Sequence, residues 1–171
     1  MRTAKDIALV GVCAALLIAG QAALSSISGV EVVTVILLCF SFSMGAARGV
    51  AAATVFSLLR CFLFGFYPNV IVLYLTYYNL FALFFGWLGT RLREKKEAVR
   101  LISSVACAVV FTALFTLLDD VLTPLICGFS PRAAKLYFYA SFSAMMPQML
   151  CAAVTVTVFF TPLTRLLRKV R

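Results

Sequence analysis

The sequence contains no histidine, and only six of its 171 residues are acidic. Histidine is the usual general base near neutral pH and a common metal ligand, so its absence removes the simplest routes to hydrolytic or metal-dependent chemistry. The six cysteines show no C-x-x-C spacing, and the chain has no G-x-S-x-G, no H-E-x-x-H and no phosphate-binding lysine loop. We therefore expect no enzymatic activity, no metal and no cofactor.

Charge is also scarce. Only 12% of the residues are charged, against about 25% in soluble domains, while 64% are hydrophobic and the mean hydropathy is +1.07. A membrane-crossing helix needs about 20 apolar residues, and six such stretches account for most of the chain. The sequence predicts an all-α integral membrane protein, in which residues 1–171 form a single bundle of six transmembrane helices. The predicted spans are about 5–25, 30–46, 49–66, 70–91, 99–118 and 136–167.

The 15 lysines and arginines are distributed very unevenly. With the N-terminus in the cytoplasm, twelve fall on cytoplasmic segments, two on outer segments (Arg132 and Lys135) and one, Arg60, within a span. The positive-inside rule therefore predicts cytoplasmic N- and C-termini in a bacterial-type cell membrane. On this interpretation the net charge of +9 sets topology and contacts lipid headgroups, and nucleic acid is not a partner.

The longest outer connection is expected to cover the bundle. It runs from Asp119 to Lys135 and is largely apolar, while Pro124, Gly128 and Pro131 interrupt a helical pattern. We expect this segment to fold back over the outer end as a lid.

Arg60 is the most informative single residue. A charge near the middle of a membrane helix costs at least about 2.5–3.5 kcal/mol, and such residues normally face protein, water or a ligand. Aromatic side chains with a few fixed polar groups are typical of small-molecule sites, and a guanidinium suits a carboxylate or phosphate. The residues that we expect to bind a ligand are Glu31, Arg60, Tyr74, Tyr78, Tyr137 and Gln148.

Several of these residues also have a structural explanation. Arg60 is a candidate ion-pair partner for Glu31 or Asp119. Tyr137, with Tyr67 and Tyr139, fits an aromatic belt at the membrane surface. Gln148 follows Pro147 and is placed to satisfy carbonyl groups freed by a kink.

The first span carries small residues at four-residue spacing: Gly11, Ala15, Ala19 and Ala23. Such a stripe lets another helix approach closely within a membrane. It predicts either packing inside the bundle or a surface for a partner subunit.

With these features the chain resembles the substrate-binding S components of energy-coupling factor (ECF) transporters, a class of ABC importer. The resemblance covers nearly the whole chain and includes the six-span layout and the alanine stripe. Residues 28–44, SGVEVVTVILLCFSFSM, are similar to the family's P-N-V-E-hydrophobic motif, with Ser28–Gly29 in place of Pro–Asn. Residues 146–167, MPQMLCAAVTVTVFFTPLTRLL, are similar to the family's last span.

The resemblance implies uptake of a vitamin or related micronutrient. An S component binds its ligand from outside and associates through the stripe at Gly11, Ala15, Ala19 and Ala23 with a transmembrane coupling subunit, which carries two ATPase subunits. It then topples in the membrane to release the ligand inside. The stripe is assigned by the motif, whereas the six ligand-binding residues are our own geometric inference.

Two other functions fit the same outline. One is a non-transporting scaffold resembling the small membrane subunit of the rod-shape and cell-wall elongation machinery, which needs no ligand. The other is a stand-alone solute facilitator that works without an ATPase. Several B vitamins, cobalamin, queuosine precursors or another heterocycle would suit a site of aromatic residues and one cation.

Overall fold

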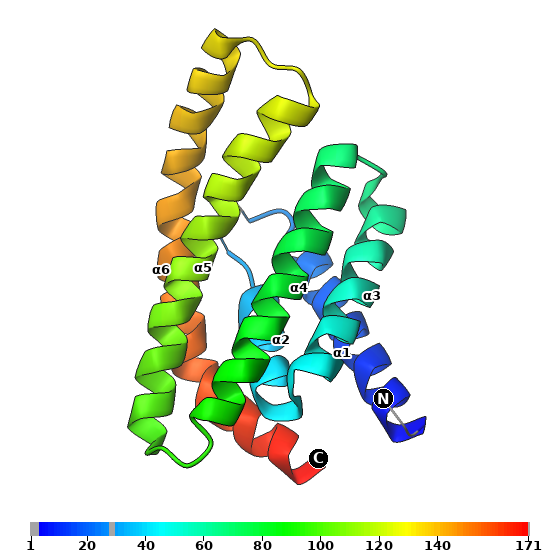
Figure 1. Ribbon diagram of the computed structural model, residues 1–171, viewed down its shortest axis with the longest axis vertical. Coiled ribbons are helices and arrows are strands. Elements are labelled where there is room, and N and C mark those ends of the chain that lie inside the picture. The colour runs from blue at the N-terminus through cyan, green and yellow to red at the C-terminus, as the bar shows by residue number, and fades with distance from the viewer. Residues whose placement is uncertain (1–3, 28–29, 171) are drawn as a thin grey trace.

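The computed structural model describes residues 4–27 and 30–170, and these form six helices and no strand (Figure 1). Five of the helices are long and apolar enough to cross a membrane, and α2 is the exception. The helices are α1 (Ala4–Leu24), α2 (Val33–Met44), α3 (Ala46–Phe64), α4 (Pro68–Arg91), α5 (Glu97–Ile126) and α6 (Pro131–Val170). The expectation of an all-helical protein is therefore confirmed, and five of the six expected spans have the length and apolar character to cross a membrane.

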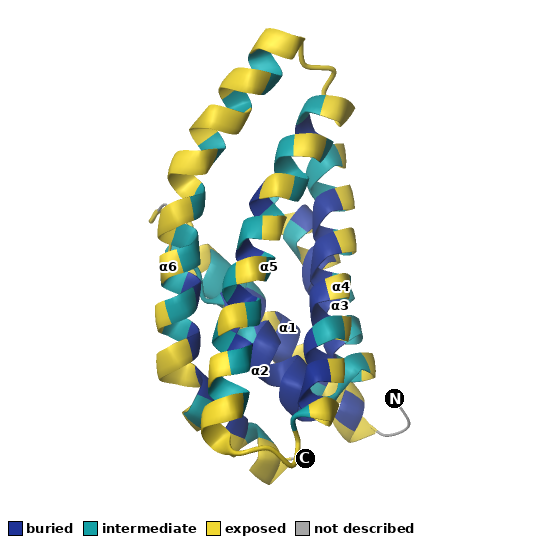
Figure 2. Ribbon diagram, turned by 60° about the vertical axis from the view of Figure 1, so that its left-hand side comes forward, coloured by how far each residue is buried: buried dark blue, intermediate teal, exposed yellow. Residues whose placement is uncertain are grey.

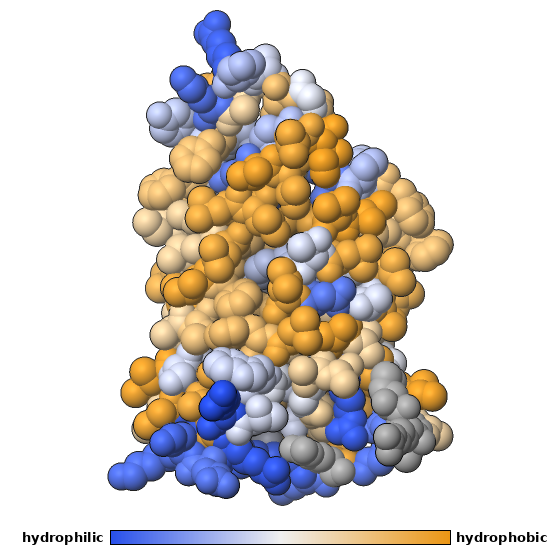
Figure 3. Space-filling view, viewed as in Figure 1, coloured by the Kyte–Doolittle hydropathy of each residue, from blue (hydrophilic) through white to orange (hydrophobic). Residues whose placement is uncertain are grey.

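The two ends of the bundle differ in chemistry. The start of α1, the end of α6 and the link 92–96 lie together at one end, which we call the basic end (Figure 1). Hydrophilic side chains gather there, a broad hydrophobic band lies above them, and a smaller hydrophilic group caps the opposite, far end (Figure 3). At the basic end Arg48 pairs with Asp6 at 2.8 Å and joins α3 to α1, while Arg165 pairs with Glu97 at 3.0 Å and joins α6 to α5.

The short helix α2 lies at the centre of the bundle. Every residue of α2 except Ile36 is buried, which is why it appears almost entirely dark in Figure 2. Its 12 residues rise about 18 Å, so α2 is shorter than the predicted span at 30–46. Gly45, with φ of 92°, ends α2, and α3 begins at the next residue. A positive φ is accessible to glycine at little cost, so this tight corner depends on Gly45.

Two glycines of α4 allow this corner to pack closely. Gly86 lies directly against the backbone of Ala46, and Gly89 lies against the backbone of Phe42. A Cβ atom at either position would overlap main-chain atoms that have no rotamer freedom to move aside. Close approach through small residues is the ordinary way in which membrane helices associate.

The expected lid over residues 119–135 is wrong. α5 continues to Ile126 and α6 begins at Pro131, so these residues extend the two helices as a hairpin that rises beyond α3 and α4 (Figure 1). Pro131 occupies the first turn of α6, where a missing N–H group breaks no hydrogen bond. Gly128, with φ of 65°, ends α5 in a left-handed turn. Gly128 and Pro131 thus bound a short connection, whereas Pro124 lies within α5.

The hairpin of α5 and α6 packs on only one side of the remaining bundle. Within the described residues, it contacts α2 and α4 but neither α1 nor α3. Its far part is held by Tyr137, which donates to Asp119 at 2.6 Å, and by Ser141, which donates to Asp120 at 2.7 Å. The seam between this hairpin and the α1–α4 body contains the cavity described next.

Candidate functional site

Glu31 lies deep in the bundle because the segment before α2 is not helical. Residues 30–32 lead into α2 as an irregular segment, and Glu31 faces Tyr77, nine residues along α4 from its start at Pro68. At 1.5 Å per residue that depth is about 13 Å below the far end of α4. The backbone of Glu31 contacts the thiol of Cys151 on α6, with its N–H group 3.4 Å from the sulfur. Glu31, expected at the membrane boundary, is therefore inside the fold.

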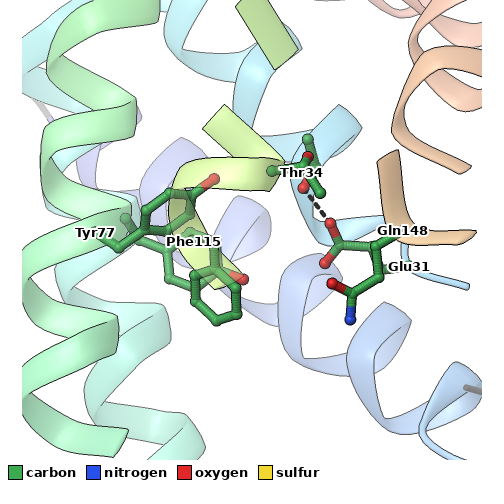
Figure 4. A pocket seen from close by; sticks show the side chains of 7 residues that line it. Glu31, Thr34, Tyr77, Phe115 and Gln148 are labelled. Atoms are coloured by element: carbon green, nitrogen blue, oxygen red, sulfur yellow. Dashed lines mark hydrogen bonds between the residues drawn. The ribbon is translucent and has the colours of Figure 1, made fainter. Parts of the chain in front are cut away.

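A narrow cavity of about 20 Å³ opens beside Glu31 at the seam between the hairpin and the body. In Figure 4, Tyr77 and Phe115 lie across the cavity from Glu31, Thr34 and Gln148. The lining residues come from the lead-in segment and from four helices: Glu31, Thr34, Tyr77, Tyr78, Thr112, Phe115 and Gln148. Its mixture of aromatic rings, hydroxyls, an amide and a carboxylate is typical of a polar small-molecule site.

The polar groups of this cavity are only partly satisfied within the protein. Thr34 donates a hydrogen bond to Glu31 Oε1, and Thr116 donates to Gln148 Oε1 at 3.4 Å. Tyr77 donates to the carbonyl of Phe111 at 3.0 Å, which fixes its ring at the cavity wall. Donor and acceptor capacity remains on the carboxylate and the amide for a bound molecule.

A second depression, of about 190 Å³, shares Glu31 with the first. We call it the Gln21 groove. It lies between the end of α1 and the start of α2, and its lining residues are Gly20, Gln21, Leu24, Ser25, Ile27, Val30, Glu31 and Val33. Gln21 donates from Nε2 to the Tyr74 hydroxyl at 3.0 Å, whereas its Oε1 is buried without a hydrogen-bond partner in the described part of the chain.

Arg60 lies over the ring of Tyr74, with its guanidinium carbon 4.2 Å from the ring centroid. Such a cation–π contact is worth about 0.5–2 kcal/mol. Its Nε and Nη1 groups are buried, and neither has a hydrogen-bond partner among the described residues. The suggested ion pair of Arg60 with Glu31 or Asp119 is wrong: within the described part of the chain, Arg60 forms an ion pair with neither carboxylate.

The six residues expected to bind a ligand fall into two groups. Glu31, Tyr78 and Gln148 line the narrow cavity, and Tyr74 lies beside it, its ring 5.0 Å from that of Tyr78 and under Arg60. Tyr137 is separate, because its hydroxyl is bound to Asp119 in the projecting part of the hairpin. The structure thus brings five of the six together.

The expected ligand-binding residues did not include four that line the cavity: Thr34, Tyr77, Thr112 and Phe115. Thr112 belongs to a buried stripe on α5, formed by Ser104, Ala108, Thr112 and Thr116 at four-residue spacing. The same spacing drew attention to the first span, so the pattern was visible on α5 as well. Thr34 lies one helical turn after Glu31, a spacing at which side chains meet.

The small-residue stripe of α1 faces away from the bundle. Gly11, Ala15, Ala19 and Ala23 are all exposed, and nothing lies within 4 Å of a Cβ atom added at Gly11. The buried face of α1 is instead formed by Asp6, Val10, Cys13, Ala14 and Leu17. Packing of the stripe inside the bundle, one of the two explanations offered for it, is therefore wrong.

No protein-family model, curated protein sequence or solved structure matches this chain. The chemistry of the site rests on its own geometry: a guanidinium on an aromatic ring with two buried N–H groups that lack acceptors, a carboxylate shared by two depressions, and an amide oxygen without a donor. These groups are suited to bind a polar molecule non-covalently.

Proposed function

We propose that this protein captures a vitamin or related micronutrient as the S component of an ECF-type importer. In this proposal all six helices lie in a bacterial-type cell membrane, with the basic end in the cytoplasm and the far end outside. α2 and its irregular lead-in segment together occupy the place of the second span. The distribution of lysine and arginine supports this orientation.

The observation that carries the proposal is that Arg60 has buried N–H groups without hydrogen-bond acceptors. Two of its N–H groups are buried with no partner in the described residues, although an unsatisfied charged donor costs several kcal/mol away from water. A residue serving only to hold helices together would be expected to have its donors satisfied. A ligand carboxylate, phosphate or carbonyl oxygen would supply the missing acceptors.

The outward stripe on α1 supports association with a coupling subunit. Within this same chain, α5 uses a stripe of identical spacing for packing and buries it, from Ser104 to Thr116. The α1 stripe, from Gly11 to Ala23, has the same potential for close helix packing, but it is exposed. In the proposed complex it binds a helix of the transmembrane coupling subunit, and two ATPase subunits supply the energy.

The first test is untargeted mass spectrometry of small molecules released from the purified, detergent-solubilised protein. The proposal expects one vitamin-like compound at a stoichiometric level, and loss of that compound from the Arg60→Ala variant. If a compound is retained equally by wild type and Arg60→Ala, the role of Arg60 is refuted. A protein that remains empty when prepared from cells grown in vitamin-rich medium would favour the scaffold function instead.

A further inference from the structure

The Glu31 carboxylate has no positively charged partner within the described chain. Its one side-chain hydrogen bond comes from Thr34, and the recorded ion pairs use Asp6 and Glu97 instead. Glu31 nevertheless lies between the narrow cavity and the Gln21 groove and lines both. A carboxylate drawn into a protein normally acquires a cation or several donors, because the loss of hydration is otherwise uncompensated.

A second acceptor belongs to a residue of the same groove. Gln21 donates from Nε2 to the Tyr74 hydroxyl, and its Oε1 is buried without a donor in the described part of the chain. Gln21 and Glu31 both line this groove, so two side chains with acceptor capacity lie in its wall. Acceptors of this kind are complementary to N–H donors and to cations, and they repel an anionic group.

We infer that the ligand presents a nitrogen group to Glu31 and Gln21, and that this group is either cationic or carries several N–H donors. This inference rests on the proposed function. An ammonium, an amidinium or an amino-substituted heterocycle has this chemistry. Arg60, on the ring of Tyr74, takes an oxygen acceptor elsewhere on the same molecule. The ligand is thus a polar heterocycle with a nitrogen-donor end and an oxygen-acceptor end.

The aromatic surface of the site connects these groups. Arg60 lies over the ring of Tyr74, with its guanidinium carbon 4.2 Å from the ring centroid, and Tyr78 lines the narrow cavity together with Glu31. Tyr74 and Tyr78 provide adjacent aromatic surfaces, with ring centroids 5.0 Å apart. A bound molecule that reaches both charges must therefore pass along aromatic surface, as a heterocycle does favourably.

The experiment exposes purified protein to the low-molecular-weight filtrate of yeast extract, washes it, and identifies the retained compounds by mass spectrometry. Wild type, Glu31→Gln and Asp120→Asn are compared. Asp120→Asn is the matched control, because it makes the same acid-to-amide change on α5 at a residue that lines neither the narrow cavity nor the Gln21 groove. We expect wild type and Asp120→Asn to retain a compound bearing an N–H-rich or cationic nitrogen group, and Glu31→Gln to retain at least about tenfold less, as for loss of a charge-assisted hydrogen bond.

The outcomes separate this inference from the proposed function. A retained compound without such a nitrogen group, or equal retention by Glu31→Gln and wild type, would overturn the inference and leave solute capture standing. Retention of no compound by wild type would refute solute capture, and the inference with it. If Glu31→Gln does not fold, Gln21→Leu tests the second acceptor, and the chemical identity of the wild-type ligand still decides the question.

Discussion

At the scale of single residues, the site depends on how Arg60 is held. Arginine has a planar guanidinium that stacks on aromatic rings and offers donors in a fixed fork, whereas lysine carries a compact charge on a flexible chain. Tyr74 provides the ring, and Gln21 holds the Tyr74 hydroxyl at 3.0 Å. In the proposed function, stacking fixes the guanidinium before a ligand arrives, which reduces the entropy lost on binding.

Replacing Arg60 by lysine preserves the charge and removes the stacked fork. We expect Arg60→Lys to weaken ligand binding by about tenfold or more, since one well-placed bidentate contact corresponds to about 1.5–3 kcal/mol. Thermal unfolding of the ligand-free protein should change little, because Arg60 forms no ion pair within the described chain. Isothermal titration of purified protein with the co-purified compound measures the first effect.

Tyr74→Phe is the matched control for this prediction. It removes the hydroxyl bound by Gln21 and keeps the aromatic ring under Arg60. Its affinity should fall less than that of Arg60→Lys. The stacking argument would be refuted if Arg60→Lys bound the ligand as tightly as wild type.

At the scale of helices, the sequence predicted regular spans well and their ends poorly. Long apolar stretches dictate helices wherever the backbone must satisfy its own hydrogen bonds, so α1, α3 and α4 lie close to their predicted positions. α2 is shorter than its apolar stretch because it ends at Gly45 and begins only after the irregular lead-in segment. Both ends depend on tertiary packing, which hydropathy does not predict. The hairpin was mistaken for a loop because Pro124 and Pro131 were taken as breakers, although proline is tolerated within α5 and at the first turn of α6.

The site was predictable to the extent that it consisted of polar groups in apolar surroundings. Glu31, Arg60 and Gln148 stood out by this criterion, and the structure places them around Tyr74 and Tyr78. Tyr137 has the same chemical character, but it lies on α6 about 16 Å along the helix axis from Gln148, the α6 residue that lines the cavity. Residues such as Phe115 join the cavity through tertiary packing alone, so a single sequence gives no separate indication of them.

The corner between α2 and α3 leads to a prediction about folding. Gly89→Leu places a large side chain against the backbone of Phe42, and we expect it to destabilise the protein by about 1–3 kcal/mol, as for overpacked cores. Gly11→Leu makes the same change at the exposed stripe of α1, where nothing lies within 4 Å of the added Cβ atom, and it should leave stability nearly unchanged. Thermal unfolding in detergent compares the two variants. Equal unfolding temperatures would show that α4 does not pack against the corner as described.

At the scale of the whole molecule, the orientation in the membrane has a built-in reporter. Cys127 is exposed at the tip of the hairpin, whereas Cys13, Cys39 and Cys61 are buried. If the far end is outside the cell, a membrane-impermeant maleimide should label Cys127 in intact cells, and Cys127→Ser should abolish that labelling. A cysteine introduced by Lys95→Cys in a Cys127→Ser background, in the link at the basic end, should react only after the cells are permeabilised. Labelling with the opposite pattern would reverse the proposed topology.

The remaining question at this scale is whether one molecule carries two independent surfaces, one for solute and one for a coupling subunit. The stripe on α1 is exposed, and its Ala15 and Ala19 line neither the narrow cavity nor the Gln21 groove. Ala15→Leu combined with Ala19→Leu adds bulk to the stripe and should block close helix packing, which depends on small residues. Ligand binding by the isolated protein should remain within about twofold of wild type, because surface changes away from the site seldom exceed about 0.5 kcal/mol.

Co-purification with a co-expressed ECF coupling module measures the other half of this prediction. The double variant should lose the complex, while Arg60→Ala should form it and fail only in binding the solute. Leu16→Ala, a change toward a smaller residue on the same exposed face, serves as the control and should retain the complex. The double variant and Arg60→Ala are expected to fail in opposite assays. If either variant lost both ligand binding and the complex, solute capture and subunit association would not be separate. If the double variant kept the complex, the stripe would not belong to the coupling interface.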